Sequence, residues 1–237
     1  MKAMILAAGL GTRFKPWTDR HPKALAMING RTLLERNIIY LQKFGIKDVL
    51  VNVHHFADQI RDAIIVNDAW GSDISLSDES GEVLETGGGL KKAAAWFDQG
   101  PFVLMNADIL TDMDLQAMIT YHEEKKSLVT LAVTKRASSR YFLFDKNNRL
   151  SGWRNTKTGE EKISIPGKEL HEKGFSGIHL ISPEIFPLMH QQGKFSIVDV
   201  YLELAAVHPI LGFDHSGSRL VDVGKPEAVA VAENLFH

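Results

Sequence analysis

The chain has 237 residues, 44% of them hydrophobic, with 27 Lys and Arg against 29 Asp and Glu and a formal net charge of -2. This length can bury a sizeable core in one α/β domain, with or without a small lid. The near-neutral charge excludes the broad basic face needed for binding along a nucleic acid, and the lack of cysteine excludes disulfides and thiolate metal sites.

Strand and helix patterns alternate through the first half of the chain. Residues 2–7 form a short apolar run ended by glycines, which predicts a first strand buried on both faces. Thr32 followed by Glu35 is a capping box that starts a helix, and Gly45 stands where a C-cap glycine belongs. The pattern further predicts strands over residues 48–53, 74–77, 101–106 and 128–134, and helices over residues 57–66, 90–97 and 112–122.

The pattern changes after residue 134. Residues 141–144 and 150–153 flank a polar Lys-Asn-Asn turn, which predicts a hairpin. Residues 155–173 are polar and patternless, and are interpreted as a mobile excursion over a site. The remaining elements predicted are a strand over 175–181, a helix over 197–207, a second hairpin from 211–215 and 219–223, and a closing helix over 226–236. Together these elements predict a Rossmann-like α/β fold, with a mixed, mostly parallel sheet covered by helices on both faces.

Neither a membrane span nor an export signal is predicted. No apolar run approaches the length that crosses a bilayer. Residues 1–8 are too short for a signal peptide and run directly into a glycine turn. We therefore expect a cytoplasmic protein with no membrane and no nucleic-acid partner.

The glycine turn after the first strand is the first candidate for chemistry. Backbone N–H groups of such a turn can bind phosphate oxygens, although an ordinary strand-to-helix turn also uses glycine. The dinucleotide-binding fingerprint fails because Phe14 occupies the place of its third glycine, and the Walker A pattern is absent. Arg13 and Lys23 place two cations near the turn, and these can neutralise charge as pyrophosphate leaves a triphosphate.

The run from Ala7 to Arg13, followed by Pro16, Thr18 and Pro22-Lys23, resembles the signature of sugar-1-phosphate nucleotidyltransferases. The resemblance covers nearly the whole chain. It implies a fold of the nucleotide-diphospho-sugar transferase type, and transfer of a nucleotidyl group from an NTP to a sugar-1-phosphate with release of pyrophosphate. It further implies catalytic roles for Arg13, Lys23 and Asp108, and nucleotide binding by Leu6, Ala8, Gly9, Gly11, Thr12, Arg13 and Gly81.

Three later segments also match this family. In residues 82–89, the glycines suit a loop around a base or sugar. Asp108 follows a strand, where carboxylates suit Mg²⁺, and Asp222 leaves a late strand before a glycine turn; as a structural alternative, each aspartate caps the turn or helix that follows it. By the resemblance, Asp108 and Asp222 hold Mg²⁺, and the substrate-binding residues are Lys23, Glu85, Thr86, Gly87, Asn106 and Gly177.

The match departs from the family pattern in the sugar half, where many members have a Glu-Lys-Pro triplet that this chain lacks. The closest resemblance within the family is to short N-acetylmuramate-1-phosphate uridylyltransferases of cell-wall recycling, which use UTP. Guanylyltransferases for mannose-1-phosphate or heptose-1-phosphate share the skeleton, and a non-catalytic nucleotide-sugar sensor is the alternative of another class. We expect a single domain, with a nucleotide-binding core over 1–134 and a sugar-phosphate part with the closing helix over 135–237, as a monomer or small homo-oligomer.

Overall fold

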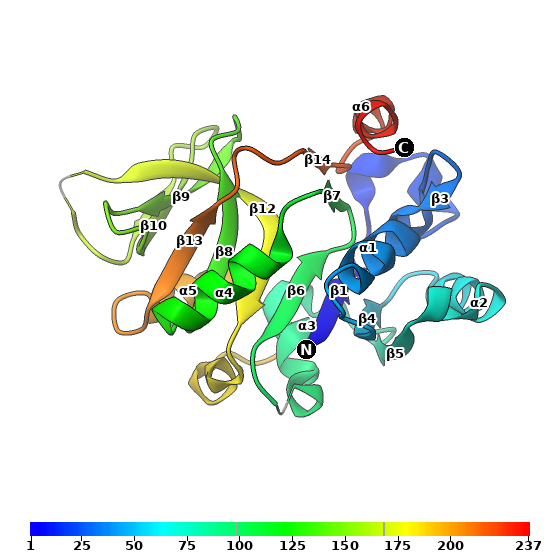
Figure 1. The fold of residues 1–237 in the computed structure, drawn as a ribbon, viewed down its shortest axis with the longest axis horizontal. Coiled ribbons are helices and arrows are strands. Elements are labelled where there is room, and N and C mark those ends of the chain that lie inside the picture. Colours follow the sequence, from blue (N-terminus) through cyan, green and yellow to red (C-terminus); the bar gives the residue numbers. More distant parts are fainter. Residues whose placement is uncertain (98, 168) are drawn as a thin grey trace.

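The computed structural model describes residues 1–97, 99–167 and 169–237. Its strands form a twisted sheet between layers of helices, as Figure 1 shows. None of the helices in these ranges has both the length and the apolar character needed to cross a membrane. The helices are α1 (Leu33–Gln42), α2 (Ala57–Val66), α3 (Glu85–Lys92), α4 (Leu115–Lys125), α5 (Ile197–Leu204) and α6 (Glu227–Leu235).

The main sheet is mixed, and its two halves differ in direction. Within the described ranges it has ten strands, in the order β11-β10-β9-β12-β6-β1-β4-β5, with β8 beside β12 and β13 beside β8. The run β6-β1-β4-β5 is parallel, whereas β12 lies antiparallel to β6, β8 and β9. The strands of this sheet are β1 (Lys2–Leu6), β4 (Asp48–Val53), β5 (Asp73–Asp78), β6 (Phe102–Asn106), β8 (Val129–Thr134), β9 (Arg140–Phe144), β10 (Leu150–Asn155), β11 (Glu161–Ile163), β12 (His171–Ile181) and β13 (Ile210–Asp214).

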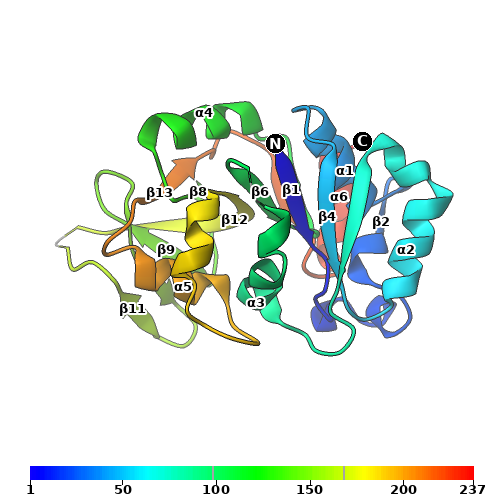
Figure 2. The same ribbon diagram turned by 90° about the horizontal axis from the view of Figure 1, so that it is seen from below.

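Both faces of the parallel half are covered, as the sequence predicts. In β1, Met4 packs into one core cluster with residues of α3 and α5, while Ala3 and Ile5 pack into a second with residues of α1, α2 and α4. This division follows from the two-residue period of a strand. Figure 2 shows α3 and α5 on one side of the sheet and α4 on the other. The predicted α/β fold is confirmed, with short pairs β2–β3 (Met27–Ile28, Arg31–Thr32) and β7–β14 (Ile109–Thr111, Leu220–Asp222) outside the main sheet.

The start of α1 follows the predicted capping box. The Thr32 hydroxyl accepts a hydrogen bond of 3.0 Å from the backbone N–H of Glu35, and Gly45 has a φ of 73°, which suits glycine after a helix end. The predicted start of α4 at residue 112 is wrong. Asp114 caps that helix, accepting from the Ala117 N–H at 3.0 Å, because Asp112 is held instead by Arg219.

Three further predictions are corrected by tertiary pairing. The glycines at 87–89 lie inside α3 and not in a loop before it. The second hairpin is wrong, because β13 pairs in parallel with β8 and β14 pairs with β7. The patternless stretch 155–173 contains β11, which pairs with β10, and the first residues of β12. The first hairpin, β9–β10, is confirmed.

Candidate active site

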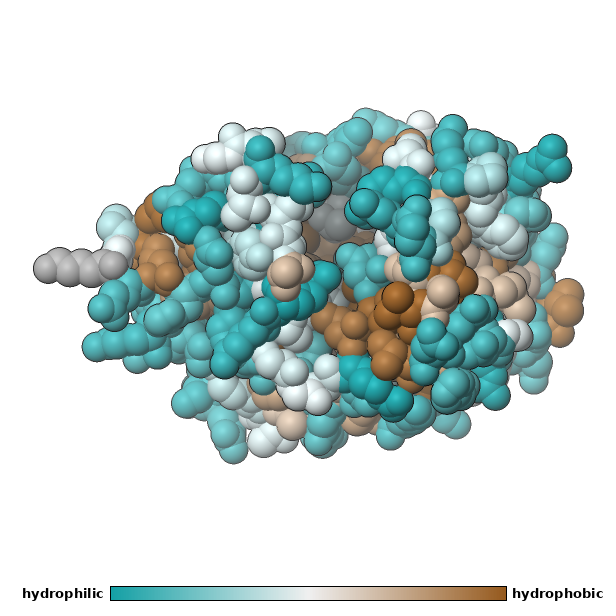
Figure 3. Space-filling view, turned by 90° about the horizontal axis from the view of Figure 1, so that it is seen from above, coloured by the Kyte–Doolittle hydropathy of each residue, from teal (hydrophilic) through white to brown (hydrophobic). Residues whose placement is uncertain are grey.

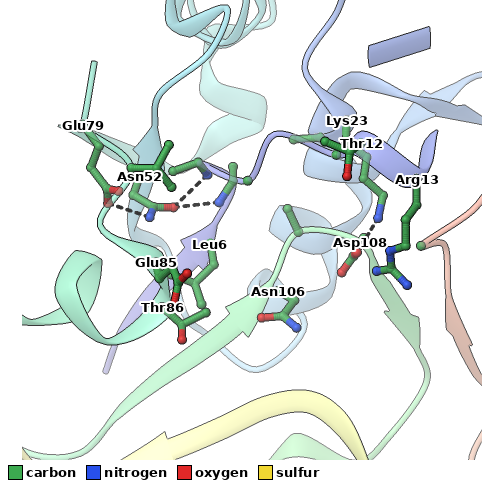
Figure 4. A pocket seen from close by; sticks show the side chains of 18 of the residues that line it. Leu6, Thr12, Arg13, Lys23, Asn52, Glu79, Glu85, Thr86, Asn106 and Asp108 are labelled. Carbon is green, nitrogen blue, oxygen red and sulfur yellow. Dashed lines mark hydrogen bonds and ion pairs between the residues drawn. The ribbon is translucent and has the colours of Figure 1, made fainter. Parts of the chain in front are cut away.

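A cavity of about 450 Å³ opens beside the carboxyl ends of β1 and β6. In the space-filling view of Figure 3 the surface is hollowed near the middle of the face, with hydrophilic residues on both sides of the hollow. Figure 4 shows a pocket at close range, with Arg13, Lys23 and Asp108 on one side and Asn52 and Glu79 on the other. The lining residues are Leu6, Ala7, Ala8, Gly9, Gly11, Thr12, Arg13, Lys23, Ala24, Asn52, Glu79, Val83, Glu85, Thr86, Asn106, Ala107, Asp108, Ser196 and Gly224.

Close packing fixes the glycine turn against the segment that carries Lys23. Gly11 has a φ of 59°, and a Cβ there would lie 2.8 Å from Thr18 Cγ2 and 3.3 Å from Lys23 Cβ. The Thr18 hydroxyl donates to the Gly11 carbonyl at 3.0 Å. Only glycine combines this backbone angle with so close an approach. The spacing of Gly11, Thr18 and Lys23 in the signature therefore has a packing cause.

Two buried side chains that the sequence did not point to, the Asn52 amide and the Glu79 carboxylate, support the glycine turn through hydrogen bonds. Asn52 Oδ1 accepts from the N–H groups of Ala7 (2.7 Å) and Ala8 (3.3 Å), and Asn52 Nδ2 donates to Glu79 Oε1 at 2.8 Å. Glu79 Oε2 accepts from the Leu84 N–H at 3.3 Å. Both side chains are almost fully buried and line the cavity. The pair therefore connects the glycine turn to the segment before α3 (Figure 4).

Two carboxylates from distant parts of the chain lie close enough to interact electrostatically, Asp108 in the lining of the cavity and Asp222 behind that lining. Asp222 in β14 lies opposite Ile109 in β7, and the Val223 N–H donates to the Asp108 carbonyl at 2.8 Å. Burial raises the pKa of Asp222, and the nearby Asp108 charge raises it further. The Asp108 carboxylate forms an ion pair with Lys23. The pairing of β7 with β14 therefore positions the two carboxylates that the sequence analysis selected.

Arg13 lies beside the two carboxylates. A Cβ placed on Gly224 would be 2.7 Å from Asp222 Oδ1 and 3.2 Å from Arg13 Nη2, so Gly224 leaves room for both side chains. Arg13 and Lys23 oppose the rise in the pKa of Asp222. The centre thus combines two carboxylates with two cations, next to the backbone of the glycine turn.

The cavity gathers most, but not all, of the site residues selected from sequence. Gly81 is exposed, with no atom within 4 Å of a Cβ placed there. Gly87 packs under the Phe195 ring, and Gly177 packs against Ile109 and Asn106. These three glycines and Asp222 do not line the cavity. The selected residues that do line it are Leu6, Ala8, Gly9, Gly11, Thr12, Arg13, Lys23, Glu85, Thr86, Asn106 and Asp108.

Residues 2–145 match the nucleotidyl transferase family, and the chain belongs to this family. It is 30% identical over 244 residues to an N-acetylmuramate alpha-1-phosphate uridylyltransferase of Caulobacter vibrioides, which covers 98% of this chain and 95% of the relative. It is 25% identical over 231 residues to a mannose-1-phosphate guanyltransferase of Yarrowia lipolytica, covering 96% of this chain and 61% of the relative. The fold is similar to the crystal structure of HddC from Yersinia pseudotuberculosis, with a TM-score of 0.80 at 23% identity, covering 100% of this chain and 99% of HddC.

Proposed function

We propose that the protein transfers a uridylyl group from UTP to N-acetylmuramate-1-phosphate, a precursor of the cell wall, and releases pyrophosphate. The uridylyltransferase relative that aligns along nearly the whole chain supports this choice of base and sugar. The observation that carries the proposal is the meeting of Asp108, Asp222, Arg13 and Lys23 beside a cavity at the glycine turn. A non-catalytic sensor does not need this full set of charges.

The proposed reaction is a direct displacement. A phosphate oxygen of the acceptor forms a bond to the α-phosphorus of UTP, and the bond from that phosphorus to the β-phosphate oxygen breaks, so pyrophosphate leaves with the electron pair. The acceptor phosphate is already nucleophilic, so no covalent enzyme intermediate is needed. The chain therefore contributes positioning and charge neutralisation. Arg13 and Lys23 stabilise the negative charge that builds up on the departing phosphates.

The two aspartates suit a divalent cation. Asp222 Oδ1 is buried and has no hydrogen-bond partner among the described residues, and burial together with the Asp108 charge raises the Asp222 pKa. A cation held by both carboxylates would supply a partner for this oxygen and offset the repulsion between the two charges. The described residues contain no cluster of three or more His, Cys, Asp or Glu that could hold a metal. Mg²⁺ matches such a site, because it takes one or two carboxylates and completes its shell with water and substrate phosphates. When bound by Asp108 and Asp222, Mg²⁺ would supply Lewis-acid stabilisation of the phosphates.

The proposal assigns the two substrates to the two halves of the chain. Residues 1–134 would bind the nucleotide, since they supply all of the cavity lining except Ser196 and Gly224. Residues 135–237 would bind the sugar phosphate. Because UTP is the proposed donor, we place the protein in the cytoplasm, with no nucleic-acid or membrane partner.

A guanylyltransferase acting on mannose-1-phosphate is the second candidate, supported by the guanyltransferase relative that aligns over 96% of the chain. Pyrophosphate release should therefore be measured for UTP, GTP, CTP, dTTP and ATP, each against N-acetylmuramate-1-phosphate, mannose-1-phosphate, heptose-1-phosphate and glucose-1-phosphate. The proposal expects the highest kcat/KM for UTP with N-acetylmuramate-1-phosphate. A preference for GTP with a hexose or heptose phosphate would support the guanylyltransferase instead. Tight nucleotide binding without turnover of any pair would indicate a sensor.

A further inference from the structure

Arg136, in the connection between β8 and β9, is a third cation at the proposed catalytic centre. Its Nη2 lies 4.0 Å from Asp222 Oδ2. The positive charge of Arg136 lowers the pKa of Asp222, as do the charges of Arg13 and Lys23. Arg136 belongs to the C-terminal half of the chain, whereas Arg13 and Lys23 belong to the N-terminal half. Neither the signature after β1 nor the later matches to the family include Arg136.

The backbone of β12 holds Arg136 in place. Its Nη2 donates to the Phe175 carbonyl at 2.7 Å. Its stem lies over Gly174, where a Cβ would be 2.9 Å from Arg136 Cγ. The side chain is still 35% exposed, and Nε is buried without a hydrogen-bond partner in the described residues. The guanidinium is therefore fixed in position but keeps unused donor capacity.

Two of the neighbouring cations already pair with carboxylates. Lys23 forms an ion pair with Asp108, and Lys173 forms one with Asp214. Arg13 lines the cavity beside the glycine turn, whereas Arg136 does not line it. Arg136 thus approaches Asp222 from the segment that follows β8 and packs on β12, whereas Arg13 belongs to the segment that follows β1.

We propose that Arg136 binds the phosphate of the sugar-1-phosphate acceptor. This inference rests on the proposed nucleotidyl transfer. In an in-line displacement the acceptor approaches the α-phosphorus opposite the departing pyrophosphate. The acceptor phosphate and the triphosphate are both negatively charged, so a cation beside the acceptor would lower the repulsion between them. A guanidinium donates in a planar fork that matches phosphate oxygens. Arg13 and Lys23 serve the nucleotide side, and Arg136 serves the acceptor side.

Steady-state kinetics of Arg136→Met tests the assignment, because methionine retains a stem to pack on Gly174 but has no charge. We expect the KM for N-acetylmuramate-1-phosphate to rise at least about tenfold, while the KM for UTP changes less than about twofold. Lys135→Met is the matched control, since Lys135 is the exposed neighbouring cation, and we expect wild-type values for it. If Arg136→Met does not fold, Arg136→Gln replaces it and carries the same expectation.

Calorimetric binding separates phosphate recognition from a structural effect. We expect the Arg136 variant to lose affinity for N-acetylmuramate-1-phosphate about tenfold and to bind unphosphorylated N-acetylmuramate as the wild type does. Equal acceptor KM in wild type and variant, or equal loss of affinity for both sugars, would overturn the inference. A wild-type protein that transfers no nucleotidyl group would instead refute the proposed function. If the wild type uses another sugar-1-phosphate, the same comparison applies with that substrate and its free sugar.

Discussion

Asp108 and Asp222 reach the charged centre in different electrostatic states. Lys23 neutralises Asp108 through an ion pair. Asp222 Oδ1 is buried and has no hydrogen-bond partner in the part of the chain that the structure describes, and burial together with the Asp108 charge raises the Asp222 pKa. A bound divalent cation would hold both carboxylates ionised and release Lys23 for a phosphate. The two residues therefore have a joint role in the proposed chemistry, although they lie far apart in the chain.

The first prediction concerns removal of either charge. Asp108→Asn or Asp222→Asn should lower kcat with Mg²⁺ at least about tenfold, which corresponds to about 1.4 kcal/mol of transition-state stabilisation. Pyrophosphate release at saturating UTP and acceptor measures the effect. Asp19→Asn is the control, because Asp19 is in an exposed pair with Lys15, 2.9 Å away. Near-normal turnover of both site variants would remove the metal assignment.

The second prediction concerns the amide behind the glycine turn. Asn52→Ala leaves the N–H groups of Ala7 and Ala8, and Oε1 of the buried Glu79 carboxylate, without the partner that Asn52 supplies. A buried polar group that loses its partner costs about 1–3 kcal/mol, so the free energy of unfolding in urea should fall by that amount. Because the turn loses its support, the KM for UTP should rise as well. Unchanged stability and unchanged KM would show that Asn52 does not brace the turn.

Lys23 could be found from the sequence as a site residue, whereas Asn52 could not. Lys23 belongs to a contiguous signature whose spacing reflects contacts with Gly11 and Thr18, so reading along the chain finds it. Asn52 and Glu79 act through contacts with segments 27 to 45 residues away. The available signal was a single polar residue inside the apolar strand Asp48–Val53, and that pattern names no partner.

Among the elements, α3 departs most from its predicted form. Its glycines are not flexible, because a Cβ at Gly87, Gly88 or Gly89 would meet Phe195, the Gly193 carbonyl or Glu79. A run of glycine favours a loop on local propensity, so the sequence alone predicted one. The partner segment 193–197 lies about a hundred residues further along the chain, which is why packing was not foreseen. The predicted second hairpin failed for the same reason, since both of its strands pair with distant strands.

The third prediction follows from this packing. Alanine at Gly88 should destabilise the protein by at least about 1 kcal/mol, although alanine is the better helix former. The added Cβ would overlap the backbone carbonyl of Gly193, which cannot move aside as a flexible side chain does. Gly81→Ala is the matched control, with open space around it and an expected change within about 0.5 kcal/mol. A stabilised Gly88→Ala protein in urea unfolding would contradict the proposed tight contact.

At the scale of the whole molecule, the alternation of strands and helices was sufficient to predict the parallel half. The strands β1, β4 and β5 follow one another in this sheet and lie side by side, whereas β6, the next strand of the sheet along the chain, pairs with β1 on its other edge. Alternation therefore predicted parallel strands covered by helices, but not their order. The second half depends on β12, which is antiparallel to β6, β8 and β9. No local pattern specifies three partners for one strand. The fold class was therefore predictable, whereas the order of the strands was not.

Three buried histidines, His122, His179 and His215, affect the stability of the molecule toward acid, because burial lowers the pKa of each. Burial lowers the pKa of His122 to about 4 and that of His179 to about 3, from an ordinary value of 6.5. His122 Nδ1 lies 2.9 Å from the Thr130 hydroxyl, and His179 Nδ1 lies 2.8 Å from the Tyr201 hydroxyl. Between pH 6.5 and about 4, the unfolded chain therefore binds protons at these positions that the folded protein does not.

The fourth prediction is that this proton uptake destabilises the fold in mild acid. Since the unfolded state binds more protons, the free energy of unfolding falls as pH decreases. His122 and His179 should each contribute a loss of about 2 kcal/mol between pH 7.5 and pH 5, and His215 adds to the loss in the same direction. Urea unfolding at the two pH values measures the loss. His122→Gln should reduce it by about 2 kcal/mol, because glutamine does not titrate, whereas His190→Gln, at an exposed position, should leave it unchanged. A wild-type protein equally stable at both pH values would show that the core holds neither His122 nor His179 neutral.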